Sequence, residues 1–206
     1  MRNLIKNRIF LTFLGLALIL LYIPINRLWT GGYNTHLPID DYFQIIPIFV
    51  LPYLLGTILF LVLPIIMMKF AEDKIFYPFI LTIIIAAAAS DLINIFIPTY
   101  VVREKIIPTD FYSDLIRLVY ANDNINNAAP SGHTFFSIIN LYFFSILLPK
   151  YRVSFFFIVL LIVLSTLFTG QHNIFDLISG LIFGALSIIL GLSLYKVLHS
   201  RFSSVK

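Results

Sequence analysis

The sequence predicts an all-α integral membrane protein, built as a single bundle of six transmembrane helices. Hydrophobic residues make up 60% of the 206-residue chain and charged residues only 12%, whereas an ordinary soluble domain carries about 25% charged residues. Too few charges are present to cover so much apolar volume in water. The apolar residues also form continuous runs with no period-two alternation, which favours helices over the strands of a membrane barrel.

Six apolar runs give the expected spans. They lie at about 9–25, 45–68, 76–98, 134–148, 153–168 and 174–198, within one domain that covers residues 1–206. A span needs about 20 residues to cross the hydrocarbon core, so the fourth and fifth runs are short for the task. The first run follows Arg2, Lys6 and Arg8, but no small-residue cleavage site comes after it. We therefore interpret it as an uncleaved anchor rather than a secretory signal.

The positions of the basic residues predict the orientation of the bundle. Ten of the 14 Lys and Arg residues fall on the side that holds both termini, so the positive-inside rule places both termini in the cytoplasm. The polar stretch 99–133, interpreted as the catalytic loop, and the connection 169–173 then face outward. The aromatic segment 29–43 is expected to form an interfacial belt on the same side. We expect the plasma membrane of a bacterium, because the chain is compact and lacks eukaryotic sorting tails.

Charge pattern and cysteine content exclude other classes. The net charge is +4, but the basic residues stand singly or in pairs between apolar runs, so they form no stripe for nucleic acid. The chain has no cysteine, which excludes disulfides, thiolate metal sites and a cysteine nucleophile. The sequence shows no carboxylate cluster for a metal, and we expect no cofactor.

Two of the four histidines stand at the outward ends of predicted spans, where a lipid headgroup would lie. His172 precedes Asp176 by four residues, so on a helix both side chains share one face. The carboxylate would orient the imidazole and stabilise its cation, leaving the other ring nitrogen free as a nucleophile or base. The alternative is a pair that only satisfies itself at a helix start. His36 and His199 lie in a loop and a tail, and we expect no catalytic role for them.

The run Pro130-Ser131-Gly132-His133 predicts a tight turn into the fourth span. Ser131 suits the N-cap, and the backbone N–H groups behind such a cap bind an anion together with the helix dipole. His133 would stand beside that anion, placed to donate or accept a proton. The alternative is a plain capping turn with an interfacial histidine.

Three further charged residues are candidates for the same site. Arg103 and Arg117 share the outward loop with the anion turn, and guanidinium groups bind phosphate in a bidentate manner. Either arginine could instead be a solvated loop charge or meet lipid headgroups. Asp91 lies inside the apolar third span, where a carboxylate is unfavourable and usually faces a cavity or a partner.

Together these residues resemble the type 2 phosphatidic acid phosphatase (PAP2) superfamily of membrane phosphatases and phosphotransferases. The second motif of that family, Pro-Ser-Gly-His, is complete at residues 130–133. The third, Ser-Arg-x5-His-x3-Asp, matches at Ser165, His172 and Asp176, but Thr166 holds the arginine position.

The departures from these motifs resemble one branch of the superfamily. Of the first motif, Lys-x6-Arg-Pro, only Arg103 remains, with Phe96 at the lysine position and Glu104 at the proline position. Motifs with fewer basic residues than the family pattern resemble those of the branch that includes inositol phosphorylceramide synthases and, more distantly, sphingomyelin synthases. The stretches 123–130 and 165–180 are also similar to that branch.

The resemblance implies a metal-independent mechanism with a lipid phosphate as substrate and membrane lipids as partners. His172, oriented by Asp176, would attack phosphorus and form a phosphohistidine. His133 would protonate the leaving oxygen and then activate the acceptor. The implied phosphate-binding residues are Arg103, Ser131, Gly132 and Arg117, and the implied supporting residues are Asp91 and Ser165.

Three functions remain open at this stage. Water as the acceptor makes the protein an outward-facing lipid phosphatase. A lipid or sugar hydroxyl as the acceptor makes it a phospho-headgroup transferase. The small number of basic residues in the motifs favours this function, because a phosphodiester substrate carries less charge than a monoester and needs fewer cations to bind it. A non-enzymatic transporter or lipid-binding membrane protein is the third, and it predicts that Asp91 matters more than the histidines.

Overall fold

The computed structural model describes residues 2–107 and 109–203. Within them the α-helices are α1 (Arg2–Ile25), α2 (Val50–Phe70), α3 (Asp73–Phe96), α4 (Phe111–Asn122), α5 (Gly132–Leu147), α6 (Arg152–Phe168) and α7 (Ile174–Ser203). The 3₁₀ turns are η1 (Asp40–Tyr42), η2 (Pro47–Phe49) and η3 (Pro149–Tyr151). Two short strands, β1 (Tyr33–Asn34) and β2 (Thr99–Tyr100), pair in parallel. Apart from this pair the described fold is helical, as the sequence predicted.

Five helices of the described chain are long and apolar enough to cross a membrane. Their apolar segments are Arg8–Ile25, Pro47–Phe70, Asp73–Phe96, Pro149–Phe168 and Ile174–Ser200. The fourth predicted span corresponds to α5, which has 16 residues. At 1.5 Å per residue α5 is about 24 Å long, less than the ~30 Å hydrocarbon core. Five of the six predicted spans therefore have the required length.

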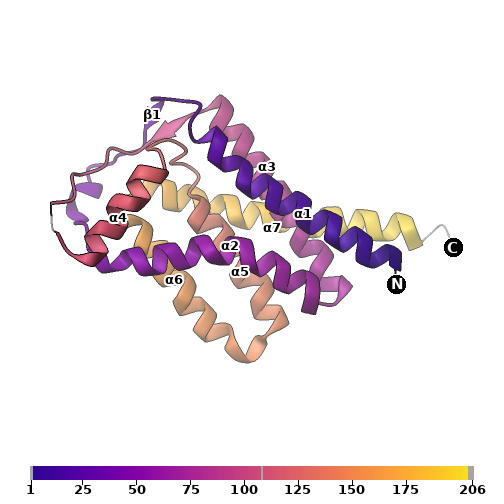
Figure 1. Ribbon diagram of the computed structural model, residues 1–206. Helices are drawn as coiled ribbons and strands as arrows, with labels where there is room; N and C mark the ends of the chain where they lie inside the picture. The colour runs from indigo at the N-terminus through magenta and orange to yellow at the C-terminus, as the bar shows by residue number, and fades with distance from the viewer. Residues whose placement is uncertain (1, 108, 204–206) are drawn as a thin grey trace.

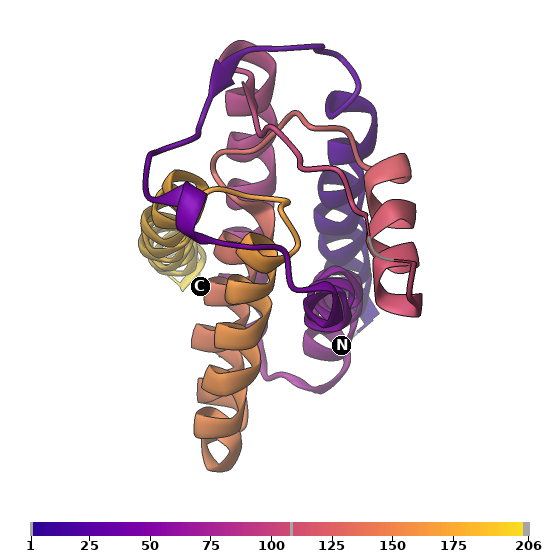
Figure 2. The ribbon, with the colours of Figure 1, turned by 90° about the vertical axis from the view of Figure 1, so that its left-hand side faces the viewer.

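Helices α1, α2, α3 and α7 run between two ends of the bundle, whereas α5 and α6 form a hairpin that meets at the bottom of the view (Figure 1). One end, which we name the loop end, carries the segments 26–49, 97–131 and 169–173. Both described ends of the chain lie at the opposite end, as the predicted topology requires. Figure 2 views the molecule from the loop end and looks along α2 and α7. Helix α3 lies centrally, since it packs against α1, α5 and α7.

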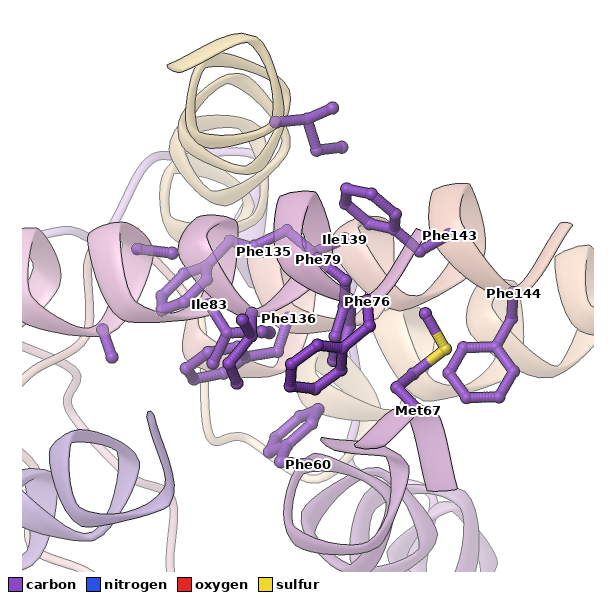
Figure 3. Packing of buried hydrophobic residues seen from close by; sticks show 14 of the residues in the cluster. Phe60, Met67, Phe76, Phe79, Ile83, Phe135, Phe136, Ile139, Phe143 and Phe144 are labelled. Atoms are coloured by element: carbon purple, nitrogen blue, oxygen red, sulfur yellow. The ribbon is translucent and has the colours of Figure 1, made fainter. Parts of the chain in front are cut away.

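Aromatic side chains form the core between α2, α3 and α5 (Figure 3). The largest members of this cluster are Phe60, Met67, Phe76, Phe79, Phe135, Phe136, Phe143 and Phe144. Helix α7 approaches α3 closely where Gly191 faces Thr82, because a Cβ on Gly191 would lie 2.9 Å from the Thr82 Cα. Close backbone approach and interlocking rings hold these helices together where lipid supplies no hydrophobic driving force between them.

The polar stretch 99–133 is more ordered than the catalytic loop that the sequence predicted. It contains α4, whose N-cap Asp110 accepts from the backbone N–H groups of Tyr112 and Ser113 at 3.0 and 3.1 Å. The Tyr120 hydroxyl of α4 donates to the Thr169 carbonyl at 2.8 Å and so joins α4 to the turn between α6 and α7. That turn passes through Gly170, whose φ of +63° suits glycine.

Candidate active site

The turn into α5 is built as the sequence predicted. Ser131 is the N-cap, with its Oγ accepting from Thr134 N at 3.4 Å and its carbonyl accepting from Phe135 N at 3.0 Å. The Ser131 N–H donates to the Asp176 carbonyl at 3.1 Å, which ties this turn to α7. Ser131 is fully buried, so its hydroxyl serves the helix start. A Cβ added at Gly132 would meet nothing within 4 Å, so open space lies beside that backbone.

His133 is held in place by α2. Its ring stacks on Tyr53 with centroids 4.1 Å apart, and Phe60 meets it edge-on at 4.9 Å. Thr57 Oγ1 lies 3.1 Å from His133 Nε2 and donates to the Tyr53 carbonyl at 3.4 Å. A hydroxyl has one hydrogen, so this pattern favours the tautomer in which Nε2–H donates to Thr57. Gly56 leaves room for the ring, because a Cβ there would lie 3.0 Å from His133 Cδ2.

His172 lies in the turn that precedes α7. The backbone N–H groups of Gln171 and His172 donate to the Thr166 carbonyl at 3.0 and 3.1 Å, which fixes the turn against α6. Asp176 Oδ2 accepts from Asn173 N at 2.7 Å and lies 3.5 Å from His172 Nδ1. The Asp176 side chain is fully buried and that of His172 is 10% exposed. The carboxylate therefore stands beside Nδ1 with little screening by solvent.

The two histidines meet at one cavity. Their ring centroids are 6.4 Å apart and their planes are inclined by 58°. The cavity has a volume of about 330 Å³, and both rings line it with Gly132 and Arg103. Attack and hydrogen-bond distances are about 3 Å each, so one phosphate ester can contact both rings. Apolar residues line another part of the wall, from α1 (Leu18, Ile19 and Ile23) and from α2 (Leu54 and Leu61).

Arg103 reaches the cavity, but polar groups of its own chain hold its guanidinium. Nη1 donates to the Asp123 carbonyl at 2.6 Å, and Nη2 donates to the Asn124 carbonyl at 3.0 Å and to Gln171 Oε1 at 2.7 Å. Its Cζ lies 4.5 Å from the Tyr120 ring centroid. The side chain is 9% exposed. Arg103 is thus a fixed positive charge at the cavity rather than a mobile fork.

Asp123 brings a carboxylate to the same cavity. Its Oδ1 accepts from the Tyr22 hydroxyl at 2.8 Å, and its Oδ2 lies 3.6 Å from Arg103 Nη2. Burial raises the pKa of Asp123, and the Tyr22 hydrogen bond and the nearby Arg103 and His172 only partly oppose this effect. The cavity wall therefore holds a second carboxyl group, close to the Arg103 cation.

Four of the predicted site residues do not line the cavity: Ser131 and Asp176, whose contacts are described above, and also Arg117 and Ser165. Arg117 Nη1 donates to the Ile106 carbonyl at 3.1 Å and Nη2 to Asp114 at 2.6 Å, so the structure engages Arg117 on the surface of α4 and does not bring it to the histidines. Ser165 donates to the Ile162 carbonyl of its own helix at 2.6 Å. Its position supports the end of α6 and not the phosphate site itself.

Asp91 does line the cavity. It is 7% exposed, and its Oδ2 has no hydrogen-bond partner within the described residues. Of the two expected surroundings, a cavity or a partner, the structure thus places Asp91 at a cavity.

The structure adds four residues that the sequence interpretation missed. Gln171 directly precedes His172, and Asp123 begins the stretch that leads to Pro130. Their places beside the motifs could have identified both as site residues. Tyr53 and Thr57 gave no local signal, because Thr57 meets a histidine 76 residues further along the chain. Within residues 2–107 and 109–203, no three or more His, Cys, Asp and Glu side chains gather as a metal site would require.

These features define an integral membrane protein with a two-histidine site at one end of its helical bundle. The chain belongs to the PAP2 superfamily, whose family model matches residues 74–199. Members of this superfamily are generally phosphatases and phosphotransferases. Comparison with curated proteins and with solved structures found no significant match.

Proposed function

We propose that the protein cleaves a lipid phosphate ester through a phosphohistidine intermediate, at the outward face of the membrane. The observation that carries this proposal is the pair of histidines from separate elements, 6.4 Å apart, at a cavity with an apolar wall. The polar end suits a phosphate and the apolar wall suits the lipid that bears it.

His172 is the proposed nucleophile. Asp176 lies beside Nδ1, so Nε2 is the ring nitrogen that attacks phosphorus. As the N–P bond forms and the bond from phosphorus to the lipid oxygen breaks, positive charge develops on the imidazole. The buried carboxylate stabilises that charge, and this is the contribution that accelerates the step.

His133 is the proposed acid and base. Its Nε2–H is engaged by Thr57, so in the cationic ring Nδ1 carries the second proton, and that proton goes to the leaving lipid oxygen. In the second step the same nitrogen takes a proton from the acceptor, which attacks phosphorus and releases His172. With water as the acceptor the products are the lipid alcohol and phosphate.

The non-bridging oxygens need donors that are in place before the reaction. Gly132 contributes its backbone N–H at the start of α5, and Arg103 contributes fixed positive charge. Gln171 adds an amide, because its Oε1 accepts from Arg103 while its buried Nε2 has no partner within the described residues. Gln171 and Arg103 thus supply, from other positions, the polarity that an arginine at the Thr166 position would have given.

The test is turnover by the purified protein in detergent. Lipid monophosphates, pyrophosphates and phosphodiesters are offered to the wild type, to His172→Ala and to His133→Ala. His36→Ala is the matched control, since that ring pairs with Asp41 on the surface. We expect phosphate release that both site variants abolish and the control retains. No turnover of any lipid, with lipid binding intact in both variants, would favour a transporter or lipid-binding protein.

A phospho-headgroup transferase is the second candidate, and the charges of the cavity favour it. The wall carries the carboxylates of Asp91 and Asp123 against the single guanidinium of Arg103. A dianionic monoester is repelled by such a wall more than a monoanionic phosphodiester is. The same preparation tests it: transfer of a headgroup to added diacylglycerol or ceramide without phosphate release would establish the transferase.

A further inference from the structure

Three polar side chains of α3 line the cavity without a role in the proposed phosphate chemistry. Ser90, Asp91 and Asn94 interrupt an otherwise apolar segment of that helix. Asp91 and Asn94 are three residues apart, so their side chains lie on one face within a single turn. They are 7% and 2% exposed, and they belong to the same cavity as His133 and His172.

In each side chain one buried oxygen is left unsatisfied by the residues that the structure describes. Asp91 Oδ2 and Asn94 Oδ1 are buried and have no hydrogen-bond partner among residues 2–107 and 109–203. An acceptor left in this state within a membrane-spanning segment carries a desolvation penalty. A carboxylate so placed is stabilised by a ligand that brings a hydrogen-bond donor into the cavity.

The position of the pair indicates which part of a ligand it meets. Asp91 lies five residues before the end of α3, about 7 Å below the loop end. Thr57, which holds His133, lies seven residues into α2, at a comparable depth of about 10 Å. Because one cavity joins both places, a single lipid that presents its phosphate to the histidines presents its adjoining backbone to α3.

We propose that Asp91, assisted by Asn94, binds a hydrogen-bond donor on the backbone of the lipid, and that the substrate therefore carries a free hydroxyl or N–H next to its phosphate. This inference rests on the proposed lipid phosphate substrate and narrows it. A diacylglycerol backbone offers only ester oxygens near the phosphate, which are acceptors and match a carboxylate poorly. A backbone with one acyl chain, or with an amide, offers the donor.

Matched lipids test the proposal. The first pair is a 1-acylglycerol 3-phosphate and its 2-O-methyl ether, which differ by one donor hydrogen. The second pair is an N-acyl amino-alcohol phosphate and its N-methyl amide, which separates an N–H donor from a hydroxyl. Each is offered to the full-length protein in detergent, and kcat/KM is measured. A hydrogen bond to a charged group predicts about a ten- to hundredfold preference for the donor lipid of at least one pair.

The variants locate the preference. Asp91→Leu should reduce the ratio to near one, and Asn94→Leu should reduce it in part. Asn140→Leu is the control, because that amide is also buried with an unpartnered Oδ1 but does not line the cavity. A preference that persists in Asp91→Leu, or equal use of both members of both pairs by the wild type, overturns the proposal.

A binding measurement separates this proposal from the proposed function. Thermal stabilisation of His172→Ala by each lipid reports binding without turnover, and the double variant with Asp91→Leu reports the contribution of the carboxylate. If no lipid is turned over but His172→Ala binds donor lipids more tightly through Asp91, the catalytic function fails and this inference stands. If lipids are turned over and bound with no dependence on Asp91, the inference fails and the catalytic function stands.

Discussion

The contact between Asp176 and His172 gives the sharpest prediction. Asp176→Asn removes the negative charge and keeps the shape of the side chain. The amide oxygen can still accept from Asn173 N, which the carboxylate now does at 2.7 Å. The start of α7 should therefore be preserved, and any loss of activity should come from the charge.

The size of that loss follows from the distance. Two unit charges 3.5 Å apart, the separation of Nδ1 and Oδ2, interact by about 5 kcal/mol at an effective dielectric constant of about 20. In the proposed reaction the imidazole becomes cationic only as the N–P bond forms, so this energy stabilises the transition state and not the bound substrate. We expect kcat to fall by about 10²–10⁴-fold with KM little changed.

The assay is trapping of the phosphoenzyme with ³²P-labelled lipid phosphate in an alkaline detergent quench, because the N–P bond of phosphohistidine is stable to base and not to acid, followed by steady-state kinetics. Asp40→Asn is the matched control, because Asp40 also accepts a backbone N–H at this helix start, from Ile174 at 2.8 Å, but it comes from the loop 26–49. The control should keep normal trapping. A loss in Asp176→Asn below tenfold, or a loss confined to KM, would refute the assignment of His172 as a nucleophile that Asp176 stabilises.

Three further predictions follow from other contacts. Gly56→Ala should lower activity at least tenfold, because the added Cβ would lie 2.7 Å from Ile162 Cγ2 and 3.0 Å from His133 Cδ2 and so displace the His133 ring. Activity in the open-space control Gly31→Ala should stay normal. Gln171→Leu should raise KM and lower kcat together, by about tenfold in kcat/KM, whereas Gln171→Glu should be worse because it adds charge beside the phosphate. Burial raises the pKa of Asp123, so wild-type stability should fall as pH rises from the ordinary carboxyl pKa of about 4 through that raised value. The Asp123→Asn variant has no carboxyl group at this position and so does not lose stability in this way. The melting temperature of the variant minus that of the wild type should therefore increase as pH rises over the same range. A difference that stays constant with pH would contradict the raised pKa.

The helices were predictable because burial in lipid requires long apolar runs, and such runs are visible in the sequence. The predicted spans and the observed helices agree to within a few residues at most boundaries. Helix α4 was missed because it is short and amphipathic, lies in a polar stretch, and is fixed by a cap at Asp110 and by packing at Tyr120. Its stability comes from tertiary contacts that a search for apolar runs does not detect.

The site was predictable only where its residues are close in sequence. Ser131 and His133 share one turn, and Asp176 follows His172 by four residues, so local geometry was enough. Arg103 and Arg117 are alike in the sequence, and only the path of the chain separates the one that lines the cavity from the one on the surface of α4.

The depth of the site is set where α5, a poor span by length, meets α2. Helix α5 has only 16 residues, and near its start His133 lies against Gly56 and Thr57, about two turns into α2. The start of α5, the proposed anion site, is thus recessed among apolar helices, where each charge acts more strongly than in water. A phosphate on a membrane-anchored lipid can descend to this level while its chains stay beside α1 and α2, whereas a free sugar phosphate would lose its hydration without such compensation. The recessed site therefore favours a lipid substrate independently of any motif, and hydrolysis of a soluble phosphate ester at rates equal to those for lipids would contradict this argument.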